Sequence, residues 1–161
     1  MDVLILGGGY GTRLFGKYNP DTYYPKGLVQ IDGKPCIEHV LDTFSNGLIN
    51  KIILETNREG KNPYENWFNN SRFREKTEIF VEEISSPDNC LGVLETIDIV
   101  SKHYKFKKPV LIISPDNLFT ENQNKLVTGY TKGARITTYE LEDLEDAKKY
   151  GVVQLESNKV V

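Results

Sequence analysis

Short apolar runs alternate with amphipathic stretches along this chain of 161 residues. Each run is bounded by glycine, proline or polar residues, which is typical of strands buried on both faces of a parallel sheet. The runs that we predict to be such strands span residues 3–6, 51–55, 78–82 and 109–113. Helices are expected between them, over residues 35–45, 63–70 and 91–101. This alternation predicts an α/β fold, with a doubly wound, mostly parallel sheet and helices on both faces.

The remaining segments connect and extend this core. Residues 7–26 are rich in glycine and proline, so we expect a long loop with at most one helical turn. Further expected elements are a short strand over 27–31, a turn at Asp32-Gly33, helices over 121–131 and 144–149, a strand over 135–140, and a hairpin of 151–155 and 160–161 around Ser157-Asn158. We expect residues 1–161 to form a single domain. Because the chain stops within a predicted strand, we expect it to be truncated at the C-terminus.

Composition and charge restrict the classes of function. The net charge of −3 argues against a nucleic-acid binder, which needs a basic face to release counterions. Cys36 and Cys90 form no CxxC pair, so we expect free thiols in a reducing compartment. No apolar run approaches the roughly 20 residues that span a bilayer, and Met1-Asp2 leads directly into the first strand. We therefore expect a cytoplasmic protein with no membrane and no nucleic-acid partner.

Three loops directly follow predicted strands, at residues 7–13, 84–92 and 114–117. In an open α/β sheet, ligands bind outside the carboxyl ends of the strands. If the strands are parallel, the three loops meet at one edge of the sheet. This convergence is the strongest argument from the residues alone for a binding site.

The first and third loops carry the residues that suit a phosphate ligand. Glycine N–H groups can turn toward an anion that side chains would keep away, although a tight turn without a ligand explains the glycines equally well. Arg13 and Lys26 favour the anion, because a solvated loop needs neither. Asp116 is placed either to hold Mg²⁺ against phosphate oxygens or to form a turn with Asn117. Its position alone does not choose between the two.

Two familiar glycine motifs do not fit the first loop. The dinucleotide fingerprint GxGxxG fails, because Thr12 stands where the third glycine belongs after Gly7 and Gly9. A P-loop nearly matches at residues 11–18, but Tyr18 replaces the hydroxyl that would hold Mg²⁺, and a following proline forbids the required helix. Both failures argue against a dehydrogenase-like dinucleotide binder and against a P-loop protein.

Several stretches of the chain form a recognisable set when they are taken in order. They are residues 8–14 (GGYGTRL), Pro25-Lys26, residues 31–39 (IDGKPCIEH), residues 89–94, Pro115-Asp116-Asn117 and residues 150–153 (YGVV). The set resembles the signature of the sugar-phosphate nucleotidyltransferases, the nucleotide-sugar pyrophosphorylases, whose pattern runs GGxGTRLxPxTxxxPK and then GKPxIEH, GTAGAL, GDN and YGVV. The resemblance covers nearly the whole chain and implies the Rossmann-like nucleotidyltransferase fold.

The resemblance also implies roles for individual residues. Arg13 and Lys26 would be the catalytic residues that bind phosphates, Asp116 would be a ligand of the cofactor Mg²⁺, and Gly151 would approach the sugar with its backbone. The residues that would bind the nucleotide are Leu6, Gly8, Gly9, Gly11, Thr12, Pro87, Asn89 and Gly92. The family's second metal-binding aspartate and its later sugar-phosphate lysine have no counterpart in this chain.

The implied reaction joins an NTP and a sugar 1-phosphate to give an NDP-sugar and pyrophosphate. UTP or dTTP with glucose 1-phosphate is favoured because that group is common, and a non-catalytic, nucleotide-binding or regulatory fragment is the alternative. Gly27 sits where proline or glutamine often follows the lysine, Ile84 where a base-reading glutamine can stand, and the segment from Phe15 to Tyr24 is longer than the pattern. The base, the sugar and the oligomeric state stay open, and a homo-oligomer is compatible with the sequence.

Overall fold

The computed structural model describes residues 1–15, 19, 22–83, 88, 91–141, 143–149, 151–157 and 159–160. The chain divides into two compact units, Met1–Gly129 and Tyr130–Val161. The expectation that residues 1–161 form a single domain stays a prediction. In the described part of the chain, every helix is too short or too polar to cross a lipid bilayer.

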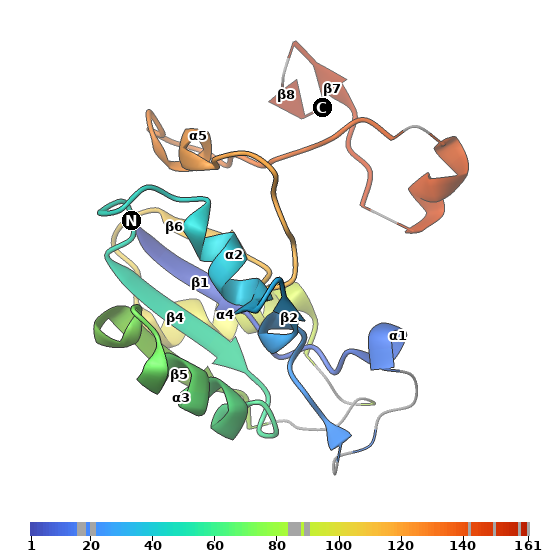
Figure 1. The fold of residues 1–161 in the computed structure, drawn as a ribbon. Coiled ribbons are helices and arrows are strands. Elements are labelled where there is room, and N and C mark those ends of the chain that lie inside the picture. The colour runs from blue at the N-terminus through green and yellow to red at the C-terminus, as the bar shows by residue number, and fades with distance from the viewer. Residues whose placement is uncertain are drawn as a thin grey trace. The chain divides into compact units, whose positions relative to one another are not determined.

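The first unit is built on a parallel sheet of four strands (Figure 1). The strands are β1 (Asp2–Leu6), β4 (Lys51–Thr56), β5 (Thr77–Val81) and β6 (Val110–Ile113). Their order in space is β5-β4-β1-β6, so the chain moves outward from β1 on one side and then crosses to β6 on the other. The four strands expected from the apolar runs are thereby confirmed. The direction of winding reverses between β1 and β6, which is where doubly wound sheets bind their ligands.

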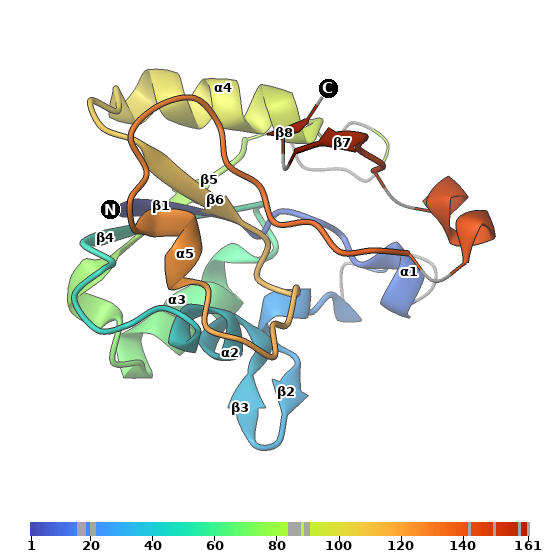
Figure 2. The ribbon, with the colours of Figure 1, turned by 90° about the horizontal axis from the view of Figure 1, so that it is seen from above.

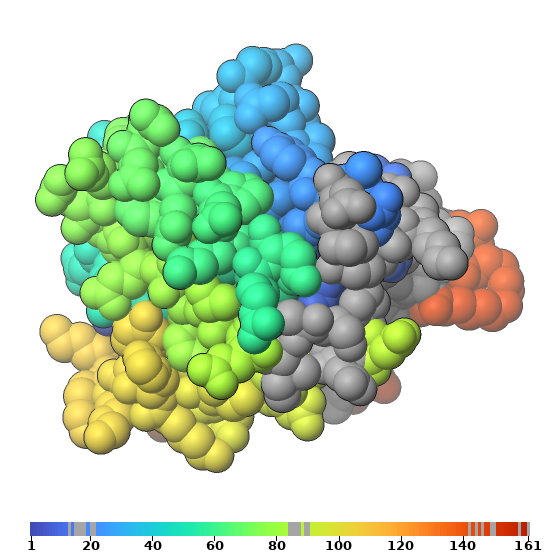
Figure 3. Space-filling view, turned by 90° about the horizontal axis from the view of Figure 1, so that it is seen from below, coloured from blue at the N-terminus to red at the C-terminus, as the bar shows by residue number. Residues whose placement is uncertain are grey.

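Helices cover both faces of this sheet, as expected. Figure 2 shows α4 (Val93–Tyr104) on one face and α2 (Cys36–Asp42) with α3 (Lys61–Asn70) on the other. In Figure 3 the green atoms of α3 lie toward the upper left and the yellow atoms of α4 toward the lower left of the view. Side chains of a strand alternate between the two faces. Accordingly, Val3 packs in the cluster under α2 and α3, whereas Leu4 packs in the cluster with Val100 of α4.

The β1–β4 pairing keeps each face in register. Val3 lies opposite Ile52, and Leu4 lies opposite Ile53. All four side chains are at most 1% exposed. Burial of apolar surface stabilises a fold by roughly 25 cal/mol per Å². The buried strands β1 and β4 are therefore firmly packed, and the loops at their carboxyl ends start from fixed positions.

Short elements link the sheet strands of the first unit. They are α1 (Thr12–Phe15), η2 (Lys26–Leu28), β2 (Gln30–Ile31), β3 (Lys34–Pro35), η3 (Arg74–Lys76) and α5 (Asn124–Val127). Strands β2 and β3 pair antiparallel around the expected turn. Its central residues Asp32 and Gly33 have φ of 49° and 75°, which is the backbone of the type I′ hairpin turn.

Two of the expected elements of this unit are corrected. Residues 27–31 do not form one strand, because the N–H groups of Leu28 and Val29 bond back to Pro25 and Lys26 in the 3-10 turn η2. The helix expected over 121–131 is confined to α5. It stops because Thr128 is extended and Gly129 has φ of 67°.

The second unit contains η5 (Leu144–Lys149), β7 (Leu155–Glu156) and β8 (Lys159–Val160). Strands β7 and β8 pair antiparallel, which confirms the expected hairpin in a shorter form. The strand expected over 135–140 is wrong: the residues are irregular and exposed, and no described strand pairs with them. None of the described residues of this unit is buried.

Candidate active site

The loop of residues 7–13, called the glycine loop below, follows β1 directly. Two side chains donate hydrogen bonds to its carbonyl groups. Asn57 donates from Nδ2 to the carbonyl oxygen of Gly8 (2.9 Å), and the Tyr23 hydroxyl donates to that of Gly9 (3.3 Å). Among the described residues no peptide bond is cis, and in a trans peptide the C=O and N–H groups point in opposite directions. The N–H of Gly9 therefore faces away from Asn57, as a backbone donor for an anion should.

The glycines of this loop are required for different reasons. A Cβ at Gly8 would lie 2.3 Å from Oε1 of Glu55, and one at Gly7 would lie 2.8 Å from the Glu55 carbonyl oxygen. Gly11 has φ of 67°, which disfavours any side chain. A Cβ at Gly9 would meet no atom within 4 Å. Packing inside the protein therefore does not explain Gly9. The reason for glycine at this position is the open space in front of the loop.

A lysine and an aspartate from distant parts of the chain meet beside this loop. Lys26 begins η2, Asp116 follows β6, and Nζ of Lys26 lies 3.4 Å from Oδ2 of Asp116. The Ser114 hydroxyl donates to the other oxygen of Asp116. The two charged side chains are 29% and 31% exposed, so both remain accessible to a ligand. Together with Leu6 and Gly9 they line a small hollow of about 80 Å³ at the reversal point between β1 and β6.

Gly27 next to Lys26 is explained by its packing. A Cβ there would lie 2.7 Å from Pro115 and 2.8 Å from the Tyr64 hydroxyl. Tyr64 on α3 is fully buried. The departure from the family pattern at this position therefore goes with a large aromatic side chain that fills the space.

The other expected site residues fall into three groups. Gly11 and Thr12 lie where the loop enters α1, and Gly92 caps α4, its N–H donating to Oε2 of Glu95 (3.1 Å). The backbone of Arg13 lies in α1, but its side chain, like Pro87 and Asn89, is outside the described residues. Gly151 belongs to the second unit, and its approach to a sugar stays a prediction.

The sequence interpretation missed the acidic and amide side chains beneath the loop. Glu55 and Asn57 at the end of β4 are 2% and 1% exposed, and Glu82 just after β5 is 8% exposed. Burial, followed by the charge of Glu82, raises the pKa of Glu55 to about 8. A glutamate that ends an apolar strand was a signal in the sequence, because charged residues are seldom fully buried without a partner.

Cys36 and His39 on α2 are structural, as far as the described residues show. Cys36 is a free, buried cysteine, and burial raises the pKa of its thiol. A ring nitrogen of His39 lies 2.8 Å from the carbonyl oxygen of Ile31. The free thiol expected at Cys36 is confirmed, while Cys90 lies outside the described residues.

The residues at this site fit a magnesium ion that is also bound by phosphates. Among the described residues, no three His, Cys, Asp or Glu side chains gather into a metal-binding group. Mg²⁺ is usually bound through one or two carboxylates, with substrate phosphates and water completing the shell. The Asp116 carboxylate and the Ser114 hydroxyl are oxygen donors of the required kind.

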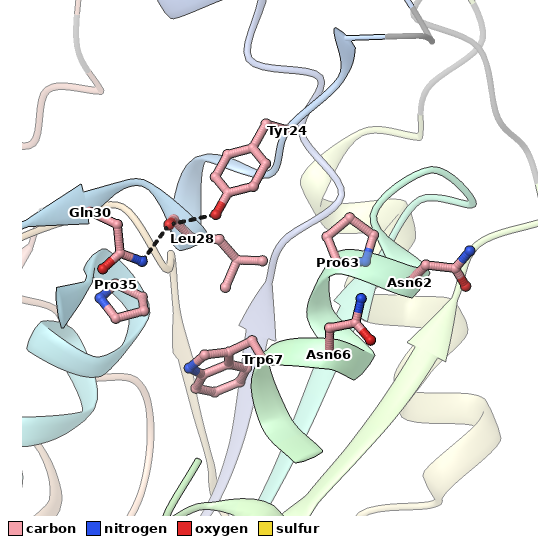
Figure 4. A pocket seen from close by; sticks show the side chains of 8 residues that line it. All are labelled: Tyr24, Leu28, Gln30, Pro35, Asn62, Pro63, Asn66 and Trp67. Carbon is pink, nitrogen blue, oxygen red and sulfur yellow. Dashed lines mark hydrogen bonds between the residues drawn. The ribbon is translucent and has the colours of Figure 1, made fainter. Parts of the chain in front are cut away.

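A larger hollow, of about 580 Å³, lies between η2 and α3 (Figure 4). Aromatic, amide and aliphatic side chains line it, and none of them is charged. In Figure 4 the Tyr24 hydroxyl and the Gln30 amide both point to the carbonyl oxygen of Leu28, at 3.1 and 3.2 Å. This lining offers nothing to neutralise a triphosphate, so the smaller, charged hollow is the better candidate site.

A parallel sheet of this order, with a glycine loop and a Lys–Asp pair at its reversal point, defines an α/β protein of the doubly wound class, in which ligands bind at that point. The sequence model of the family described as "Nucleotidyl transferase" matches residues 2–161. The chain belongs to this family, which confirms the resemblance to the sugar-phosphate nucleotidyltransferases.

Relatives and solved structures agree with this assignment. Over its whole length the chain is 28% identical to the bifunctional protein GlmU of Methanococcus vannielii, but it spans only 34% of that protein. A glucose-1-phosphate thymidylyltransferase structure from Bacillus anthracis matches the whole chain at a TM-score of 0.78 and 21% identity, over 62% of its own length. HddC from Yersinia pseudotuberculosis, complexed with GMP-PN, matches 78% of this chain and 52% of its own at a TM-score of 0.58 and 24% identity. At these identities the two structures show a shared fold.

Proposed function

We propose that this chain carries the nucleotide-binding part of an enzyme that joins an NTP to a sugar 1-phosphate and releases pyrophosphate. The observation that carries the proposal is the Lys26–Asp116 pair, 3.4 Å apart beside the glycine loop at the reversal point of the sheet. A cation, a carboxylate and outward backbone N–H groups suit a triphosphate with its metal ion. Membership of the nucleotidyl transferase family supports the same reaction class.

The chemistry requires positioning and charge neutralisation more than proton transfer. The second pKa of a phosphate monoester is roughly 6, so a sugar 1-phosphate is mostly dianionic at pH 7 and can attack the α-phosphorus without a general base. Lys26 would bind phosphate oxygens, and Arg13 would stabilise charge on the leaving pyrophosphate. The N–H of Gly9 would hold the triphosphate in line for the attack.

Asp116, with Ser114 behind it, is the residue that would hold Mg²⁺ in this unit. When bound, the ion supplies positive charge between phosphate oxygens. Lys26, which lines the same hollow, would also supply positive charge to the phosphate oxygens. Competition between Lys26 and a metal ion for the same carboxylate is expected, because Lys26 already pairs with Asp116.

For the substrates, we propose UTP or dTTP and glucose 1-phosphate. The fold match to a protein described as a glucose-1-phosphate thymidylyltransferase supports this choice. Gly151 and the nucleoside-binding roles of Pro87, Asn89 and Gly92 rest on the resemblance of their motifs to those of the family. We propose the cytoplasm as the compartment on the cysteine usage, and a homo-oligomer stays compatible with the sequence.

The test is a matrix of nucleoside triphosphates against sugar 1-phosphates, with pyrophosphate release as the readout. We expect release only when both substrates and Mg²⁺ are present, with the highest rate for UTP or dTTP, and loss of release with a chelator. Thermal stabilisation by an NTP without release from any pair would instead support the non-catalytic, nucleotide-binding alternative. Neither release nor stabilisation would contradict both functions.

A further inference from the structure

Two glutamates lie buried side by side under the glycine loop. Glu55 is at the carboxyl end of β4, and Glu82 directly follows the neighbouring strand β5. They are 2% and 8% exposed. Thr96 on α4 donates its hydroxyl hydrogen to Oε1 of Glu82. Burial of two like charges this close to each other would be strongly unfavourable.

Glu55 connects this pair to the loop. Its Oε2 accepts a hydrogen bond from the N–H of Gly8 (3.3 Å), while Asn57 holds the Gly8 carbonyl from the same strand end. The other oxygen, Oε1, is buried and accepts no hydrogen bond from any described residue. Since Gly8 has no room for a Cβ above Oε1, the loop rests directly on this carboxyl group.

The groups that face Glu55 favour its protonated form. Its pKa is raised to about 8, first by burial, then by the charge of Glu82 and by hydrogen bonding with that carboxyl, and the N–H groups of Gly8 and Gly7 oppose the rise. From α3, the neutral phenol of Tyr64 faces Glu55, with Tyr23 next to it, and the pKa of Tyr64 is also raised. The titratable groups that raise the pKa of Glu55 or face it from α3 are therefore acidic or neutral.

A proton on Glu55 gives its carboxyl group a donor for the hydrogen bond with Glu82. The Glu82 carboxylate also accepts from Thr96, and Oε2 of Glu55 remains an acceptor for the N–H of Gly8. The pair then carries one negative charge instead of two. We propose that Glu55 and Glu82 share one proton at neutral pH, and that the protonated Glu55 is the positioning residue that holds the Gly8 peptide in the conformation that binds the triphosphate.

This proposal rests on the proposed function for its ligand, but the shared proton can be tested without any ligand. Loss of the proton would place a second negative charge beneath a loop that must accept a polyanion. Nucleotide affinity should therefore be full below about pH 8 and fall as the pH rises above it.

The first experiment measures the free energy of unfolding in urea from pH 5 to 9.5, without nucleotide, for the wild type and Glu55→Gln. The folded-state pKa of Glu55 is raised from 4.5 to about 8. The stability from its proton is therefore complete below pH 4.5 and is lost as the pH rises to about 8. The difference in the free energy of unfolding between wild type and Glu55→Gln should fall across that window with the slope of one bound proton, 2.303RT per pH unit, and then level off. A flat difference would overturn the shared proton.

The second experiment measures the dissociation constants of UTP and dTTP with Mg²⁺ from pH 6.5 to 9.5 by calorimetry. In the wild type the constant should rise up to about tenfold per pH unit above pH 8, because binding then requires proton uptake. Glu55→Gln, which can donate to Glu82 and accept from Gly8, should bind well and lose this rise. The matched control is Glu83→Gln, an exposed neighbour, which should keep the wild-type profile.

Two outcomes separate the two proposals. An equal rise in wild type and Glu55→Gln would overturn the positioning role. Absence of nucleotide binding at any pH would contradict the proposed function and the role of Glu55 in it, while the unfolding data would still decide the shared proton. If Glu55→Gln does not fold, Glu82→Gln replaces it, since its amide can donate to Glu55 and should also remove the dependence on pH.

Discussion

Gly8 and Gly9 stand next to each other in the loop and are glycine for different reasons. Gly8 lies on a buried carboxyl group that leaves no room for a Cβ, whereas Gly9 faces open space. At the site, Lys26 lies at the start of η2 and Asp116 follows β6, so the two paired side chains come from distant parts of the chain. Adjacent residues of the loop therefore have different roles: Gly8 contacts the side chain that supports the loop, and Gly9 faces the space that a ligand would occupy.

Substitution of Gly8 should lower stability, whereas substitution of Gly9 should weaken nucleotide binding. Gly8→Ala forces its Cβ against Glu55, which cannot move into solvent, and should lower the free energy of unfolding by about 1–3 kcal/mol. Gly9→Ala should change that free energy by less than about 0.5 kcal/mol, but it should weaken nucleotide binding, because its methyl group occupies the open face. Urea unfolding and calorimetry measure the two quantities. Equal stability losses in both variants would contradict this division.

Lys26 should matter for turnover far more than for stability. Its partly exposed pair with Asp116 contributes at most about 1 kcal/mol to stability. Lys26→Ala should lower the rate of pyrophosphate release on the order of 10²–10³ fold, as for loss of a group that stabilises transition-state charge. Lys34→Ala is the matched control, because Lys34 pairs with Asp42 on the surface. A Lys26→Ala enzyme as fast as this control would show that Lys26 is not catalytic.

At the scale of elements, the central position of β1 decides where the site lies. β1 pairs with β4 on one side and with β6 on the other, so the loop after β1 is adjacent to the turn after β6. The 3-10 turn η2 then brings Lys26 to the same edge. The helices α2, α3 and α4 pack against the sheet and fix the strand ends, while the charged pair at the site comes from η2 and from the segment after β6.

The β1 strand should accordingly dominate the stability of the first unit. Leu4 is 1% exposed and packs against Ile53 and Val100, so Leu4→Ala should lower the free energy of unfolding by about 2–5 kcal/mol. Leu94→Ala on α4 removes the same atoms from a side chain that is 81% exposed. This substitution should change the free energy of unfolding by less than about 0.5 kcal/mol. Comparable losses in urea unfolding would mean that β1 is not central to the core.

At the scale of the whole molecule, the buried residues are confined to one of the two units. Every buried side chain of the described residues lies between Val3 and Pro115. In residues 130–160 the described side chains are exposed or partly exposed. A segment that buries so little apolar surface cannot offset the conformational entropy of ordering its chain.

The two units should therefore differ when they are separated. A chain ending at Gly129 should unfold in urea as one cooperative transition, followed by the fluorescence of Trp67, because it keeps the complete core. A peptide of Tyr130–Val161 should give the circular dichroism of an unfolded chain. A broad, non-cooperative transition in the first, or stable structure in the second, would contradict the confinement of the core.

Local patterns were sufficient for the elements whose own residues specify them. Apolar runs predicted the four sheet strands, and Asp32-Gly33 predicted a turn, because burial and backbone preference act within a few residues. The prediction of a strand over 135–140 was wrong, since a strand also needs a neighbouring strand to pair with, and the residues themselves do not specify one. The prediction of a helix over 121–131 was too long, because the turn at Gly129 ends the helix despite the helical periodicity of the residues.

The sequence by itself therefore determined the fold class, the family motifs and the loops that form the candidate site. Only the tertiary structure decided which residues surround those loops. The distance between Lys26 and Asp116, the clash that keeps Gly27 a glycine, and the proton-binding environment of Glu55 all depend on segments far apart in the chain. Burial and charge are properties of the packed surroundings, so a glutamate that ends an apolar strand reveals its role only when the neighbouring strand places Glu82 beside it.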